Sequence, residues 1–223
     1  ETRLLSGPWW GKAEPIYVTS LPRTAETDLG SVRNVRFSNV VADCENGALV
    51  YGSEEATVEN VELSGVRLEI SGSENSELTG GNFDLQPTGA KTPIFERDVA
   101  GVHCEGVSGL DLRDVTVEWE DDSGVLPAYY SHGLQCVDVA DVDVRGFEGR
   151  QAHRDGEEAA VALREVETVS VRDSRASPGT GRFLESEGVR DARLFTGNDL
   201  ADADSVGLDP EAGFMLSGNL EPS

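Results

Sequence analysis

The chain carries a spacing of apolar residues that returns several times along its length. Between Gly101 and Val115, apolar residues follow one another at separations of two, three, three, two and three residues. This spacing matches neither the 3.6-residue period of a helix nor the alternation of one long strand, and it is typical of short strands joined by tight bends. The apolar positions are Val102, Cys104, Val107, Leu110, Leu112 and Val115.

Three later stretches repeat this pattern, the last of them weakly, and two earlier stretches carry its second half. Corresponding positions lie 26, 49, 32, 27 and 23 residues apart, and the interval of 49 has room for about two units. Because one unit cannot bury its apolar residues alone, the copies must stack, and stacked short strands form parallel sheets. The sequence therefore predicts an all-β fold, a right-handed parallel β-helix that advances about 4.8 Å per turn. The other copies begin at Val32, Val58, Leu134, Val161 and Leu184, and the weak one ends with Ala192, Leu194 and Gly197.

The pattern indicates one domain over residues 1–223, the truncated part of a longer solenoid. We expect an opening loop at residues 1–29, repeats at 30–198 and a tail at 199–223, in which the apolar residues Phe214, Met215 and Leu216 fold back over the last turn. Residues 67–100 interrupt the pattern and are expected to form the walls of a cleft. A second excursion, residues 119–132, carries carboxylates, aromatic residues and a histidine, which suit a sugar site but are equally common on an exposed loop.

Two kinds of residue are expected to have structural roles. Asn39 and Asp114 precede the last apolar position of a copy, as Asp173 does, and they tolerate the left-handed backbone of a sharp bend. Cys104 and Cys136 share one pattern position and should stack as buried free thiols, although a bridge between them is geometrically conceivable. No zinc motif is present, and we expect neither a metal nor a cofactor.

The charge of the chain excludes one class of partner. With 42 acidic and 18 basic residues the formal net charge is −24, so a nucleic-acid phosphate backbone would be repelled. No apolar run approaches the roughly 18–20 residues that span a bilayer, so no membrane partner is expected. All basic residues but Lys12 and Lys91 are arginines. This acidic, lysine-poor composition favours a halophilic source; an ordinary acidic protein from a GC-rich genome is the alternative.

The opening loop contains the best candidates for ligand binding. Trp9 and Trp10 lie side by side, close to Arg3, Lys12 and Glu14. Tryptophan faces stack on sugar rings, and arginine and lysine pair with uronate carboxylates. These residues predict a site for a uronate-containing polysaccharide or oligosaccharide. The alternative is that the tryptophan pair covers the apolar end of the rod.

Several phrases of the sequence resemble the C-terminal portion of polygalacturonase-like proteins of glycoside hydrolase family 28, over roughly residues 1–175. The resemblance implies a pectin-lyase-like β-helix and inverting hydrolysis of α-linked galacturonate or a related pectic chain. The phrases are Trp9-Trp10-Gly11-Lys12-Ala13-Glu14-Pro15-Ile16-Tyr17, Val32-Arg33-Asn34-Val35-Arg36-Phe37-Ser38-Asn39-Val40, Glu45-Asn46-Gly47-Ala48-Leu49-Val50-Tyr51-Gly52 and Phe83-Asp84-Leu85-Gln86-Pro87.

The same resemblance places the catalytic groups elsewhere. The family carries Asn-x-Asp, Asp-Asp and Gly-His-Gly elements before an Arg-Ile-Lys element, which Arg3-Leu4-Leu5 matches only at its arginine. The carboxylates would then precede Glu1, and this chain alone would be inactive. Asp121-Asp122 and Ser131-His132-Gly133 superficially resemble the Asp-Asp and Gly-His-Gly elements. They are weak catalytic candidates, because His132 follows Asp122 by only ten positions, which is too few for one turn of the solenoid.

Two other functions remain open at this point. One is a non-catalytic β-helix that binds polysaccharide or serves as a structural rod. The other is a pectate-lyase-like elimination enzyme, which would need calcium held by clustered carboxylates. Secretion of the full-length protein is slightly favoured.

Overall fold

The chain forms an all-β structure of parallel strands. The computed structural model describes residues 14–53, 55–72, 83, 98–120, 126–154 and 156–222. One 13-stranded sheet contains every strand of these residues, and a single turn of 3-10 helix spans Pro210–Ala212. None of the helical turns in this part of the chain is long and apolar enough to cross a bilayer. The strands are β1 Tyr17–Ser20, β2 Val32–Cys44, β3 Ala48–Gly52, β4 Val58–Ile70, β5 Val102–Trp119, β6 Leu134–Arg145, β7 Glu148–Gly149, β8 Ala159–Arg172, β9 Arg175–Ala176, β10 Thr180–Glu187, β11 Asp191–Thr196, β12 Ala203–Ser205 and β13 Met215–Ser217.

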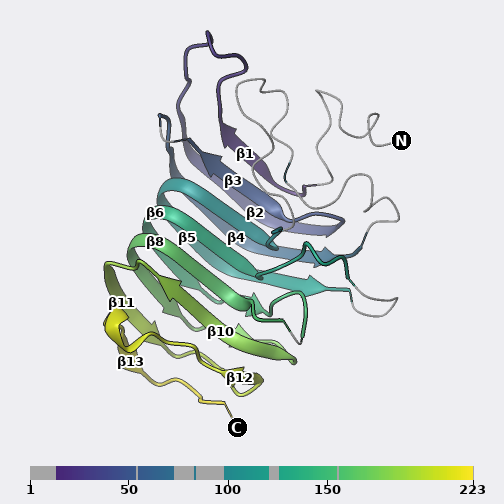
Figure 1. Ribbon diagram of the computed structural model, residues 1–223, viewed down its shortest axis with the longest axis vertical. Helices are drawn as coiled ribbons and strands as arrows, with labels where there is room; N and C mark the ends of the chain where they lie inside the picture. Colours follow the sequence, from purple (N-terminus) through teal and green to yellow (C-terminus); the bar gives the residue numbers. More distant parts are fainter. Residues whose placement is uncertain are drawn as a thin grey trace.

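The strands stack along the long axis of the molecule, from β1 and β2 near one end to β12 and β13 near the other (Figure 1). Long strands bend and contribute to more than one row of pairings. We call β1-β3-β5-β6-β8-β10-β12 the first ladder, to which β5 contributes residues 102–105. The second ladder is β2-β4-β5-β6-β8-β11-β13, with residues 110–113 of β5. A third ladder joins the end of β5 to β7 and β9.

The pairing register confirms the apolar pattern as a set of stacked positions. Val102 pairs with Leu134, and Cys104 with Cys136. In the second half of the pattern, Val58 pairs directly with Val107. The interval of 49 residues therefore holds one layer, and the expectation of about two units was wrong. The extra length lies between Ile70, where β4 ends, and Val102, where β5 begins in the next layer.

In the weak last copy, the constant apolar spacing predicts the pairing wrongly by one residue. A register shift between Ala192 and Leu194 makes Leu194 the partner of Ser170 and Phe195 the partner of Val171. Phe195 is fully buried and Leu194 is not. A β-bulge adds one residue to one strand, so a constant spacing fails where a bulge occurs.

The tail also differs from expectation. β13 pairs in parallel with β11, and Met215 and Leu216 remain 66% and 56% exposed. Only Phe214 turns inward, with its ring 5.9 Å from that of Phe195. The apolar run therefore adds a strand to the second ladder instead of covering its end. At the other end, the expected opening loop contains strand β1.

One column of bends explains the asparagine and aspartate positions. Asn39, Asp114 and Asp173 have φ values of 56°, 51° and 51°, as expected for turn formers. As far as Gly197 they alternate with glycines on successive layers. A β-carbon placed on Gly146 would lie 2.6 Å from Oδ1 of Asp114, so the glycine gives the carboxylate room. In layer order the column is Asn39, Gly65, Asp114, Gly146, Asp173, Gly197 and Gly218.

The interior is filled by the apolar positions of the pattern, and it includes the stacked cysteines. Cys104 and Cys136 are fully buried and unbridged, as expected for small apolar side chains. Burial raises the pKa of the Cys136 thiol to about 12, so this thiol stays protonated at neutral pH.

Candidate functional site

The outer face of the first ladder presents two rows of side chains. Val102 and Cys104 point into the core, so the intervening His103 and the following Glu105 point outward. We call the row that includes His103 the covered row, because its central members are buried. The row that includes Glu105 is the open row, because its members are half-exposed or exposed. The covered row is Tyr17, Leu49, His103, Gln135, Ala162 and Glu185; the open row is Thr19, Tyr51, Glu105, Val137, Arg164 and Glu187.

His103 connects the two rows through hydrogen bonds. Its Nδ1 lies 2.8 Å from Oε1 of Gln135, and its Nε2 lies 3.0 Å from Oε2 of Glu105. Both ring nitrogens therefore lie within hydrogen-bond distance of side-chain oxygens on neighbouring positions of the ladder. The arrangement orients the half-exposed Glu105 carboxylate toward the surface.

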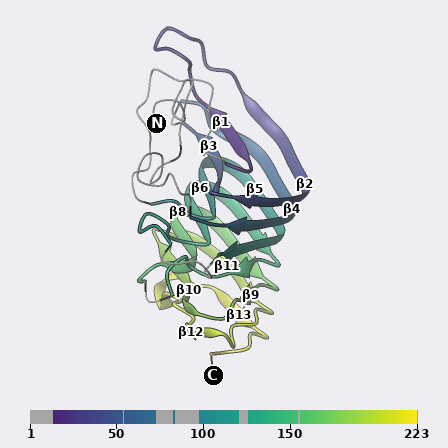
Figure 2. The same cartoon turned by 90° about the vertical axis from the view of Figure 1, so that its right-hand side faces the viewer.

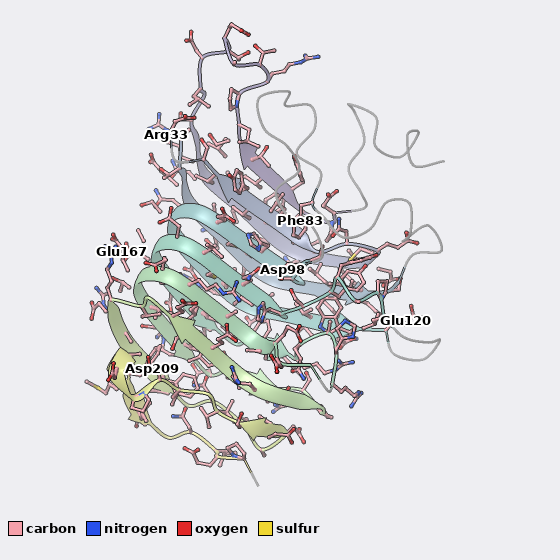
Figure 3. The ribbon with its side chains drawn as sticks, viewed as in Figure 1. Arg33, Phe83, Asp98, Glu120, Glu167 and Asp209 are labelled. Carbon is pink, nitrogen blue, oxygen red and sulfur yellow. The ribbon has the colours of Figure 1, made fainter. Side chains whose placement is uncertain are left out.

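Phe83 covers the imidazole from outside. Its ring centre is 5.9 Å from that of His103, and both side chains are almost completely buried. In the view of Figure 3, the labels of Phe83 and Asp98 fall on the ladder strands, and Glu120 lies nearer the margin of the molecule. The covered row is thus a packed wall beside the open row.

Basic groups gather at the β8–β10 end of the face. Arg164 lies 3.5 Å from Glu185, and Arg182 lies 3.4 Å from the same carboxylate. The Arg164 side chain is 39% exposed. A half-exposed arginine that shares its partner with a second arginine keeps donors free for an anionic ligand.

Two of the predicted site residues come to the same edge of the first ladder. Counting back from the paired residues, Glu14, Asn46, Ala100 and His132 occupy one register position. Nδ2 of Asn46 donates to Oε1 of Glu14 over 3.4 Å. Glu14 and His132 are three layers apart, a separation of about 14 Å at the usual strand spacing. Glu14 and His132 therefore lie along the same edge of the first ladder but do not contact each other.

His132 is held by the backbone of the next layer. The Ala159 N–H donates to its Nδ1 over 3.0 Å, and the side chain is buried. Burial lowers the pKa of His132. The other predicted site residues, Arg3, Trp9, Trp10, Lys12, Asp121 and Asp122, lie outside the described residues.

The tyrosines of the second excursion pack against the body of the structure. Tyr130 is buried, and its hydroxyl donates to the carbonyls of Glu45 and Ser71 over 2.6 and 2.9 Å. Its ring lies 5.1 Å from Trp119 and 4.7 Å from the half-exposed Tyr129. Tyr130 therefore anchors this excursion, and Tyr129 is the one of the pair that reaches the surface.

Sequence reasoning did not single out His103, Glu105 and Gln135. A signal was present, because His103 and Glu105 are polar residues out of phase with the apolar Val102 and Cys104. Their pairing with Gln135 depends on the register of the next strand, 32 residues away.

Within the described ranges, no group of three or more His, Cys, Asp or Glu side chains is arranged to hold a metal ion. None of the protein-family models, curated proteins and solved structures compared with this chain matches it.

Proposed function

We propose that the chain is a right-handed parallel β-helix that binds a uronate-containing polysaccharide along the open row. In this proposal it is the scaffold and part of the cleft of a polygalacturonase-type glycoside hydrolase. The catalytic carboxylates lie outside this sequence, because the family's Asn-x-Asp, Asp-Asp and Gly-His-Gly elements have no convincing counterpart in it.

The pairing of successive layers supports the proposed architecture. The same strand segments return in each layer in the order first ladder, second ladder and, in the middle layers, third ladder. Connections between parallel strands of one sheet are right-handed in nearly all proteins, which supports the handedness.

The observation that carries the proposed ligand is the open row itself. Its six side chains sit in register on adjacent strands, so they repeat about every 4.8 Å along the rod. A polymer that presents one repeating unit per layer can contact each of them. Tyr51 supplies an aromatic face, Glu105 and Thr19 supply hydrogen-bonding groups, and Arg164 can pair with a uronate carboxylate.

A binding experiment with two arginine variants tests this proposal. Arg164→Gln removes the cation of the open row and should weaken binding of oligogalacturonate about tenfold, as expected for loss of a charged hydrogen bond. Arg190→Gln is the matched control, because Arg190 pairs with Glu167 away from the first ladder. Calorimetric titrations in KCl solution would measure both. Equal affinities for the two variants would refute the assignment of the open row.

The catalytic part of the proposal needs a separate measurement. Release of reducing ends from polygalacturonate should occur with a chain extended upstream and should be absent with residues 1–223 alone. Binding without activity in both forms would favour a non-catalytic polysaccharide-binding rod. Unsaturated products whose formation stops with a calcium chelator would favour the lyase alternative.

A further inference from the structure

The second ladder has a groove on its outer face that the proposed function does not use. The groove has a volume of about 960 Å³, and its lining comes from β2, β4, β5, β6, β8 and β11. These six strands are consecutive neighbours, so the groove extends over five strand spacings, about 24 Å. β2 and β4, which form one end of it, lie side by side in Figure 2.

The hollow shape has a local cause at the bend that starts the second ladder. Asn34 and Asn60 stack there with φ values of 57° and 53°, and Nδ2 of Asn60 donates to Oδ1 of Asn34 over 3.2 Å. Gly109 takes the same position in the next layer, where a β-carbon would lie 2.9 Å from Oδ1 of Asn60. The amide stack therefore ends at a residue without a side chain, which leaves space above the strand.

The charges of the groove are nearly balanced. Its lining includes the carboxylates of Glu62, Asp111, Asp141 and Asp143 and the guanidinium groups of Arg36, Arg172 and Arg193. Arg36 lies 2.5 Å from Glu62, and Arg172 donates to Asp143 over 2.6 Å. These pairs neutralise two of the four carboxylates, and Arg113 donates to Asp111 over 2.8 Å, so a third carboxylate of the lining is also paired.

Several polar groups of the lining remain available to a ligand. The hydroxyls of Thr168 and Ser170 and the carboxylate of Asp141 make no hydrogen bond or ion pair within the described residues, and all three residues are at least partly exposed. They lie on two adjacent strands, with Asp141 paired to Thr168. Together with Asn34 and Asn60 they offer both donors and acceptors, as a chain of hydroxyl groups requires.

We propose that this groove binds a neutral, extended glycan chain, one sugar unit per strand layer, at a second site distinct from the open row. Each of the groove's arginines, Arg36, Arg172 and Arg193, has a carboxylate partner of its own, so the groove has no cation left to attract a uronate or another anion. The lining also contains the apolar residues Val35, Val61, Leu110, Val142 and Leu194, but a wholly apolar ligand would leave the polar groups of Thr168, Ser170 and Asp141 without hydrogen bonds. The lining contains no aromatic side chain, so hydroxyl contacts repeated along the chain supply the affinity.

Titration with neutral β-1,4-linked oligosaccharides of two to six units tests the proposal, with backbone amide shifts of β6 and β8 as the readout. Affinity should rise with length over this whole range, because each of the six strands of the groove takes one sugar unit. The double variant Thr168→Val, Ser170→Ala should bind about tenfold more weakly, because two modest hydrogen bonds are lost. The matched control is Thr116→Val, Ser64→Ala, which makes the same changes outside the groove lining.

The result separates this site from the open row. Arg164→Gln should leave binding of the neutral oligosaccharide unchanged, whether or not oligogalacturonate binds to the first ladder. The proposal is overturned if no neutral oligosaccharide shifts the amides of Thr168 and Ser170. It is also overturned if the groove prefers oligogalacturonate, or if affinity is independent of chain length.

Discussion

At the scale of single residues, the column of bends with positive φ predicts that a side chain at Gly146 destabilises the fold. The variant Gly146→Ala must adopt a φ of 69° and place its β-carbon 2.6 Å from Oδ1 of Asp114. The left-handed backbone alone costs about 1–2 kcal/mol, and the displaced carboxylate adds to it. Urea unfolding should show a loss of at least this size. Gly30→Ala is the control, because nothing lies within 4 Å of its added β-carbon. Equal stability of the two variants would contradict this account of the column.

A second residue-scale prediction concerns His132 and pH. Burial lowers its pKa from 6.5, and this outweighs the opposing fields of Asp98 and Glu185. The unfolded chain therefore binds a proton at a higher pH than the folded chain does. The contribution of His132 to stability is complete above about pH 6.5 and is lost as the pH falls through the folded pKa. His132→Asn keeps an acceptor for the Ala159 N–H and should flatten the pH dependence of unfolding free energy between pH 7 and 5. An unchanged slope would show that another group controls it.

At the scale of strands, the apolar spacing was sufficient to predict which residues stack. The partners Cys104 and Cys136 follow from the spacing because a buried position can face only the same position on the next layer. The spacing predicted the wrong partner for Leu194, because a bulge inserts a residue there. Burial of Met215 and Leu216 was also predicted wrongly, because their apolar character did not imply burial. The residues that form the covered row and the open row could not be predicted either, because polar side chains on the surface of a strand follow no hydrophobic periodicity. Only the register shows that His103 lies beside Gln135.

At the scale of the whole molecule, charge decides how stability responds to salt. Even if all 18 basic residues were paired, 24 of the 42 acidic residues would keep an unbalanced charge. The ion pairs of the described residues are mostly half-exposed, such as Arg67 with Glu118 at 2.8 Å, and pairs of this kind contribute about 0–1 kcal/mol each. Salt weakens these attractions and the general repulsion together. The repulsion dominates, because at 0.01 M salt the Debye length of about 30 Å lets charges interact across many layers.

The melting temperature should therefore rise as KCl increases from 0.01 to 0.5 M, by about 2–4 °C for each 1 kcal/mol of repulsion removed. Screening is nearly complete at the upper concentration, so most of the rise should occur early in the titration. Sucrose of equal osmolality is the control, since it strengthens burial without screening charge. A melting temperature that stays constant or falls in KCl would mean that the excess carboxylates lie too far apart to destabilise the fold. A rise of the same size in sucrose would assign the effect to burial and not to charge.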